Sequence, residues 1–327
     1  MKRNAETVAT VHPRAEPYFF SKGDIGCLLI HGFTGSPPEL LPLGEYLVDQ
    51  GCTVLAPLLA GHGTSAEDLA RTRWTDWLKS AMIGLDRLRA EPVKQVYLIG
   101  LSMGGLLALL LAVNQSISRG ERYRPDEFEP VRPLKSVPAT APKKAIKSRN
   151  KLADESFPVP FWLDRVLPKE LQTFPEHSDK DKREVPIAGV IMLNTPIFIR
   201  NSKVRFSPWL QWFFPYTSKE FEVISAKEAD ALRFSYTDIP IRGVANLLRL
   251  IQYVKERLRR IEVPALVIQS RVDETVRPES GEFIYRNLGS EQKKILWLEK
   301  SPHLLTLSSE KDRIFQTIVE WIKRSRE

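Results

Sequence analysis

Short apolar runs recur along the chain, and amphipathic or apolar stretches of helical length separate several of them. The runs are continuous rather than alternating, which is typical of strands buried on both faces of a sheet. They occupy residues 27–30, 53–56, 95–99, 190–193, 265–268 and 295–298. Helices are expected at 40–49, 74–88 and 106–113. This order predicts an α/β fold built on a mostly parallel, doubly wound sheet.

Two segments interrupt this pattern. Residues 115–187 hold 10 of the 24 prolines and contain no strand or long periodic helix before residue 157. We therefore predict a polar, partly disordered insertion there. Residues 199–260 are rich in aromatic side chains and end in an expected helix at 246–259, which predicts a helical cap. The predicted core comprises 20–114, 188–198 and 261–327.

Composition places the chain among ordinary globular proteins. Of 327 residues, 43% are hydrophobic and 27% are charged, which allows a large buried core. The two cysteines, Cys27 and Cys52, exclude a disulfide scaffold and a cysteine-based zinc site. The net charge of +8 comes mainly from residues 130–151, which contain seven Lys/Arg and no acidic residue. The rest of the chain carries about +1.

The basic segment 130–151 has two interpretations. It is either a solvated linker or a peripheral contact with an anionic membrane surface, where each Lys or Arg contributes ~1 kcal/mol. No aromatic residues interleave with its charges, so nucleic-acid binding is not expected.

The first ten residues lack an apolar run, so we expect no secretory signal and a cytoplasmic protein. Glycines interrupt the uncharged stretch 96–118, which predicts a buried strand, turn and helix rather than a membrane span.

The sequence Gly100-Leu101-Ser102-Met103-Gly104 is a G-x-S-x-G motif between an expected strand and an expected helix. In this context the serine occupies a sharp strand-to-helix turn that exposes its hydroxyl. The flanking glycines let the backbone turn without Cβ clashes. Ser102 is therefore the predicted nucleophile, and a purely structural Gly/Ser turn is the less favoured alternative.

A serine hydroxyl needs a general base to act as a nucleophile. Two histidines follow Ser102 in the chain. His177 lies in the polar insertion, where a solvated surface histidine is the better interpretation. His303 follows the last expected strand, which is where the base of this fold is placed. His303 is therefore the predicted base.

The base in turn needs an orienting carboxylate, expected in the loop after the strand at 265–268. Asp273 is the first choice in that loop, and Glu274 is the alternative. Glu274 could instead be a solvated partner of Arg271 or Arg277. Asp238, which precedes the strand, is a weaker third candidate.

The motifs together resemble the α/β-hydrolases of the bacterial carboxylesterase and monoacylglycerol-lipase group. The similar stretches cover most of the chain outside 115–187; they are 28–37, 61–65, 98–105, 190–199, 267–278 and 298–307. The resemblance implies a Ser102, Asp273, His303 triad. It also implies an oxyanion hole in which the Phe33 N–H joins the N–H of Met103, the residue after the nucleophile. One departure is Pro302, where relatives often carry glycine before the histidine.

The resemblance implies a serine hydrolase that cleaves carboxylic esters through an acyl-enzyme. Short-to-medium acyl esters or monoacylglycerols are the expected substrates, so the partner is a small-molecule or lipid ester. A thioesterase, a C–C hydrolase or an acyltransferase would use the same residues. A non-catalytic binding module is the third hypothesis. No metal or organic cofactor is expected, and the oligomeric state is left open.

The residues around the predicted triad have two further expected roles. His31 is expected to brace its loop by hydrogen bonds, and His62 to order a loop near the pocket. The aromatic side chains of the cap are expected to form its own core and to line the acyl pocket. The predicted pocket residues are Trp209, Trp212, Phe213 and Phe214.

Overall fold

The computed structural model describes residues 10–117, 185–211, 214–218, 234, 236 and 238–325. Most of the predicted insertion and part of the predicted cap therefore lie outside the described residues. Within the described residues, no helix is both long and apolar enough to cross a bilayer.

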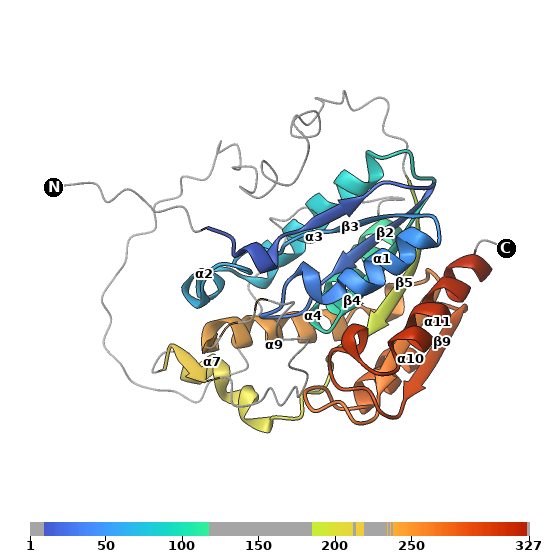
Figure 1. Cartoon of the computed structure of the whole chain (residues 1–327). Coiled ribbons are helices and arrows are strands. Elements are labelled where there is room, and N and C mark those ends of the chain that lie inside the picture. The colour runs from blue at the N-terminus through green and yellow to red at the C-terminus, as the bar shows by residue number, and fades with distance from the viewer. Residues whose placement is uncertain are drawn as a thin grey trace.

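A seven-stranded sheet with the strand order β1-β3-β2-β4-β5-β8-β9 forms the centre of the described structure (Figure 1). The strands are β1 (Tyr18–Phe20), β2 (Ile25–Ile30), β3 (Cys52–Ala56), β4 (Gln95–Leu101), β5 (Ile187–Leu193), β8 (Ala265–Ser270) and β9 (Lys293–Leu298). Every neighbouring pair is parallel except β1 and β3. The prediction of a mostly parallel sheet is confirmed, and the antiparallel edge strand β1 was not predicted.

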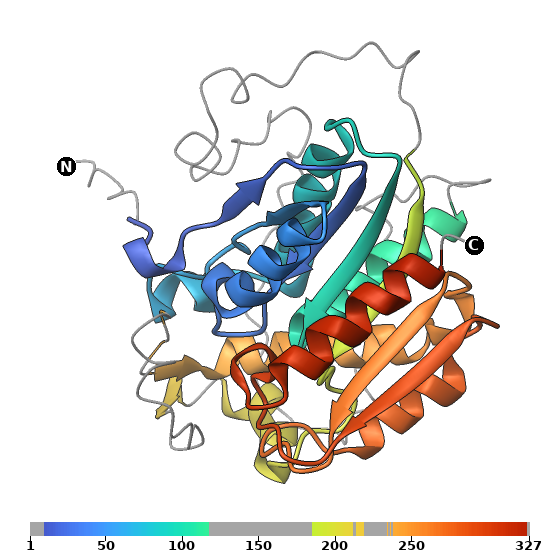
Figure 2. The same ribbon diagram turned by 45° about the vertical axis from the view of Figure 1, so that its right-hand side comes forward.

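Helices cover both faces of the sheet. They are α1 (Leu41–Asp49), α2 (Ala66–Arg71), α3 (Trp74–Arg89), α4 (Met103–Ile117), α9 (Ile241–Lys255), α10 (Glu279–Asn287) and α11 (Lys311–Arg324). Figure 2 shows α1 and α11 in front of the sheet. In β2, Cys27 and Leu29 pack into the apolar cluster on the α1 and α11 side, whereas Leu28 and Ile30 pack into the opposite cluster with α3 and α4. Burial on both faces explains why the strands are continuous apolar runs.

The observed helices differ from the predicted ones mainly at their ends. α4 begins at Met103 rather than 106, because the glycine-rich turn is already part of the helix. α9 begins at Ile241, directly after Pro240 in extended conformation, and ends at Lys255. The expected end at 259 falls instead in a short 3-10 turn, Leu258–Arg260. Helices α2, α10 and α11 were not predicted.

The described part of the predicted cap is only partly helical. It contains a 3-10 turn at Ser202–Phe206, the short helix α7 (Ser207–Leu210) and a two-stranded antiparallel sheet. The two strands are β6 (Tyr216–Ser218) and β7 (Asp238–Pro240), and β7 leads directly into α9. Figure 1 shows α7 and α9 near the edge toward which the β5 and β9 arrows point. The predicted limits of core and cap stay predictions.

Tyr97 provides a test of how the C-terminal helix is joined to the sheet. Its buried hydroxyl donates a hydrogen bond of 3.1 Å to the carbonyl of Ile322 in α11. Tyr97→Phe should lower the free energy of unfolding by about 1 kcal/mol, because the mutation removes a buried hydrogen bond with little change of shape. Chemical denaturation measures this change. Ser325→Ala, which removes a local bond to the Trp321 carbonyl, is the control and should change stability less; equal effects would contradict the prediction.

Candidate active site

Ser102 occupies the turn between β4 and α4. Its φ of 53° lies in the left-handed region, which is costly for a residue other than glycine. The Ser102 N–H donates to the carbonyl of Leu193 at the end of β5, 2.8 Å away. The side chain is partly exposed. The sheet therefore holds a strained turn that presents the hydroxyl, as the motif predicted.

Two glycines allow neighbouring segments to approach this turn. A Cβ on Gly104 would lie 1.9 Å from the Ile30 carbonyl oxygen, so only glycine lets α4 start this close to the end of β2. A Cβ on Gly32 would lie 3.2 Å from the Ser102 Cβ and 3.8 Å from its Oγ. The loop after β2 therefore lies against the serine.

The two residues of the predicted oxyanion hole, Phe33 and Met103, directly follow Gly32 and Ser102 in the chain. Met103 is the first residue of α4, and the first N–H groups of a helix have no acceptor within it. Phe33 follows Gly32, and its ring packs on Trp77 and lies close to Gly243 of α9. The assignment of these two N–H groups to an oxyanion stays a prediction.

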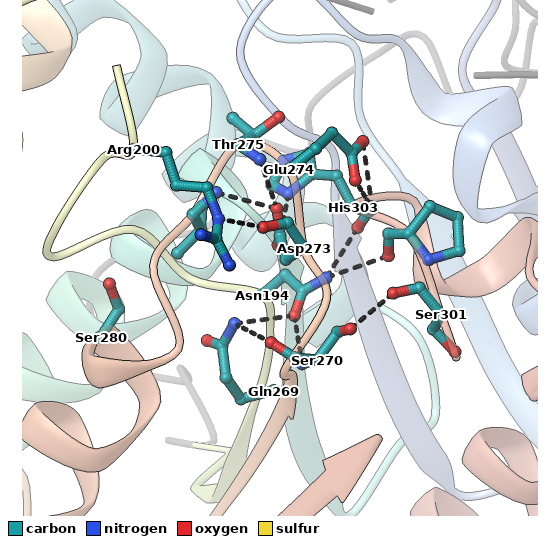
Figure 3. A network of polar contacts seen from close by, with 12 residues as sticks. Asn194, Arg200, Gln269, Ser270, Asp273, Glu274, Thr275, Ser280, Ser301 and His303 are labelled. Carbon is teal, nitrogen blue, oxygen red and sulfur yellow. Dashed lines mark hydrogen bonds and ion pairs between the residues drawn. The ribbon is translucent and has the colours of Figure 1, made fainter. Parts of the chain in front are cut away.

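His303 and Asp273 contact each other directly (Figure 3). The imidazole Nδ1 lies 2.8 Å from Asp273 Oδ2. Asp273 is fully buried, and its second oxygen accepts hydrogen bonds from the N–H groups of Thr275 and Val276, at 2.7 and 2.8 Å. In the neutral imidazole this arrangement puts the proton on Nδ1 and leaves Nε2 free to accept one.

The other candidates for acid and base are placed elsewhere. Both carboxylate oxygens of Glu274 accept from the backbone N–H of His303, at 3.2 and 3.4 Å, not from its ring. Glu274 is not the partner of Arg271 or Arg277, whose nearest carboxylates are Glu299 and Glu279. The remaining two candidates are Asp238, which is exposed in β7, and His177, which lies outside the described residues.

Burial and three nearby carboxylates shift the pKa of the His303 imidazole in opposite directions. Burial by itself would lower the pKa of the imidazole. The charge and hydrogen bond of Asp273 oppose this effect, and the charges of Glu274 and the buried Glu39 add to the opposition. The net result is a pKa of His303 above its ordinary value. A neutral, proton-accepting imidazole therefore requires a pH above this raised pKa.

Two residues that were not predicted from the sequence, Arg200 and Asn194, support the acid loop, the segment 271–278 that carries Asp273. The Arg200 guanidinium donates through Nε to the Asp273 carbonyl and through Nη2 to the Arg271 carbonyl. The buried Asn194 side chain bonds both Ser270, at the end of the strand that leads into this loop, and the loop that carries His303 (Figure 3). The signal for Asn194 was its position as the first polar residue after the apolar run at 190–193.

His31 directly follows β2, and its buried ring contacts the buried ring of His62. His31 donates from Nδ1 to the Gly32 carbonyl and accepts at Nε2 from the Leu59 N–H. Burial, and then the neighbouring His62, lower the pKa of His31 well below its usual range. Burial also lowers the pKa of His62 to about 4, against hydrogen bonds to the backbone of Ala60 and Leu59. Both rings are therefore neutral at pH 7, and the His31 bonds brace the loop after β2.

The predicted pocket residues are only partly described. Trp209 and Phe214 are 79% and 58% exposed, while Trp212 and Phe213 lie outside the described residues. The acyl pocket therefore stays a prediction. Within the described residues, no group of three or more His, Cys, Asp or Glu side chains could hold a metal ion.

Comparison with known proteins assigns the family. The model of the alpha/beta hydrolase family matches residues 27–317, so the chain belongs to that family. It is 25% identical over 309 residues to a carboxylesterase of Bacillus subtilis strain 168, covering 94% of this chain and 96% of that protein. It is 27% identical over 312 residues to a thermostable monoacylglycerol lipase of Bacillus sp. strain H-257, covering 95% of each.

Solved structures agree with this assignment. A chain reported with LipS and LipT, two metagenome-derived lipolytic enzymes, is 25% identical, with a TM-score of 0.70. That similarity covers 96% of this chain and all of the other. Monoacylglycerol lipase from Paleococcus ferrophilus is 16% identical with a TM-score of 0.61 over 94% of this chain and 98% of its own, which shows the shared fold. The predicted α/β-hydrolase fold is confirmed.

Glu274→Gln tests the electrostatic environment of His303. The amide oxygen can still accept from the His303 N–H, but the negative charge is lost, so the pKa of the imidazole should fall. An NMR titration of the five histidines, with His303 assigned by its absence in His303→Ala, measures this shift. Glu299→Gln removes a carboxylate that pairs with Arg271 at the exposed rim and should leave the titration unchanged. An unshifted or higher pKa in Glu274→Gln would contradict the prediction.

Proposed function

We propose that this protein is a serine hydrolase that cleaves carboxylic esters through an acyl-enzyme intermediate. The hydrogen bond between the buried Asp273 carboxylate and the His303 imidazole is the observation that carries the proposal. This hydrogen bond orients the imidazole, and the loop that carries His303 leaves the same edge of the sheet as the strained Ser102 turn. Such a pair is the arrangement that converts a serine hydroxyl into a nucleophile.

In the proposed reaction, Ser102 Oγ attacks the ester carbonyl while His303 Nε2 takes its proton. Asp273 holds the imidazole in the required tautomer and stabilises the imidazolium. The carbonyl oxygen becomes negatively charged, and the N–H groups of Phe33 and Met103 stabilise it. The carbon–oxygen bond to the alcohol then breaks, and the alcohol leaves with the proton from His303. Water repeats the sequence on the acyl-Ser102 ester and releases the acid.

The relatives support an ester as the substrate. Two proteins that match nearly the whole chain are a carboxylesterase and a monoacylglycerol lipase. Both names describe hydrolysis of carboxylic esters by a scaffold of this length. We therefore propose short-to-medium acyl esters or monoacylglycerols as substrates of this chain. The predicted cap, whose described helices α7 and α9 lie near the edge toward which the β5 and β9 arrows point (Figure 1), would select among them.

Ser102→Ala tests the proposed nucleophile. Hydrolysis of p-nitrophenyl esters should fall at least 1,000-fold, on the order seen when a triad member is removed, and a fluorophosphonate probe should no longer label the protein. Circular dichroism and the thermal midpoint check that the variant remains folded. Ser290→Ala, at the buried serine before β9, should keep activity and labelling. Wild-type turnover in Ser102→Ala would refute the proposal.

The chain-length profile tests the proposed acyl pocket. Each buried CH₂ gains ~0.8 kcal/mol, so kcat/KM should rise from C2 toward roughly C4–C8 p-nitrophenyl esters and fall for very long chains. Trp212→Ala or Phe213→Ala should shift the optimum rather than lower all rates equally. The profile is measured for wild type and both variants. A flat profile, or variants that change only stability, would place the acyl group elsewhere.

A further inference from the structure

Asn194 lies one residue beyond the end of β5, and its side chain is fully buried. We propose that Asn194 is a positioning residue that fastens the loop carrying His303 to the end of β8, which leads into the loop carrying Asp273, and so sets the distance from the imidazole to Ser102. The proposal rests on the proposed function of these three residues.

The amide of Asn194 uses its full hydrogen-bonding capacity. Oδ1 accepts from the backbone N–H of Ser270, at 2.8 Å, and from Nε2 of Gln269, at 3.1 Å. Nδ2 donates to the carbonyls of His303 and Pro302, at 3.0 and 3.3 Å. A primary amide has two donors and two acceptor lone pairs. The backbone N–H on one side and the carbonyls on the other fix which way the amide faces (Figure 3).

The main chain beside Asn194 extends the link to the nucleophile. The Leu193 carbonyl accepts from the N–H of Ser102, and the Asn194 N–H donates to the Ile268 carbonyl, 2.8 and 2.9 Å away. In the sheet, β5 lies between β4 and β8. Two consecutive residues at the end of β5 therefore contact the nucleophile turn, the end of the strand that leads into the acid loop, and the base loop.

The loop that carries His303 is held largely by side chains from outside it, although the His303 carbonyl also accepts from the Leu305 N–H, 3.1 Å away. Pro302 has no N–H to donate. The Ser301 carbonyl accepts from the Ser270 hydroxyl, and the next two carbonyls accept from Asn194. The His303 N–H donates to Glu274. Loss of Asn194 would remove the donor to the Pro302 carbonyl and leave the His303 carbonyl with the hydrogen bond from Leu305.

The backbone at Asn194 also restricts the residue type. Its φ of 43° lies in the left-handed region, which asparagine tolerates better than most residues and glycine adopts without strain. Asn194→Gly therefore removes the side chain and keeps the backbone conformation. Asn194→Asp keeps the shape and the acceptor for Ser270 but replaces the two donated hydrogen bonds with a carboxylate facing carbonyl oxygens.

The experiment compares both variants with wild type in p-nitrophenyl ester hydrolysis. We expect kcat per active site, counted by fluorophosphonate titration carried to completion, to fall about 100-fold, the size expected for a misplacement near 1 Å. KM should stay within about twofold. The downfield proton NMR signal of His303 Nδ1–H, which reports its bond to Asp273, should broaden or shift in both variants. The thermal midpoint is measured to confirm folding at the assay temperature.

Three outcomes separate the hypotheses. Wild-type kcat per active site and an unchanged Nδ1–H signal in folded Asn194→Asp or Asn194→Gly overturn the positioning role, even if stability has fallen. Asn287→Ala, which removes an amide donor to the Phe283 carbonyl in α10, is the matched control and should leave kcat and the signal unchanged; equal losses there also overturn it. Activity retained by Ser102→Ala would instead refute the proposed function, while the NMR signal still tests Asn194.

Discussion

Parallel strands end at the same edge of a sheet, so the loops that follow β4, β5, β8 and β9 leave that edge side by side. These loops carry Ser102, Asn194, Asp273 and His303, which are far apart in the sequence. Burial on both faces holds the strands in register and therefore holds the loops in place. The geometry of the site follows from the packing of the core beneath it.

The rigid sheet supports local strain at its edge. Ser102 and Asn194 both have positive φ values, and such residues cost of order 1–3 kcal/mol each. Ser102 is held by the Leu193 carbonyl, and Asn194 by four side-chain hydrogen bonds and its own N–H. The end of β5 thus holds Ser102, while the end of β8 and the loop that carries His303 hold Asn194. In these conformations the Ser102 side chain is partly exposed, and the Asn194 amide bonds both Ser270 and the His303 carbonyl.

The Asp273 carboxylate is fully buried. An isolated charge in this environment would be strongly destabilising. Two backbone N–H groups and the His303 imidazole form hydrogen bonds with the carboxylate of Asp273. The backbone carbonyl of Asp273 accepts a further hydrogen bond from Arg200. The segment 198–200 pairs with 275–277 through the Arg200 and Arg277 N–H groups. The acid loop is therefore held by the start of the predicted cap segment as well as by the sheet.

Local patterns predicted the scaffold well. Continuous apolar runs revealed the six parallel strands among the described residues, because burial on both faces leaves a direct mark on composition. The motif around Ser102 and the positions of Asp273 and His303 after strands were also visible, since each depends on a short segment and its place in the chain order. Strand β1 and helices α2, α10 and α11 were missed, and the N-terminal limits of α4 and α9 were placed several residues too late.

Only the tertiary structure decided which polar groups meet. It brought Asp273 rather than Glu274 to the imidazole, and it placed Asn194 between the end of β8 and the loop that carries His303. It also showed Trp209 and Phe214 to be exposed. Hydrogen bonds such as that from Asn194 to the His303 carbonyl join residues more than a hundred positions apart. Such pairs have no period or spacing in the sequence, because their partners are chosen by the order and register of strands in the folded sheet.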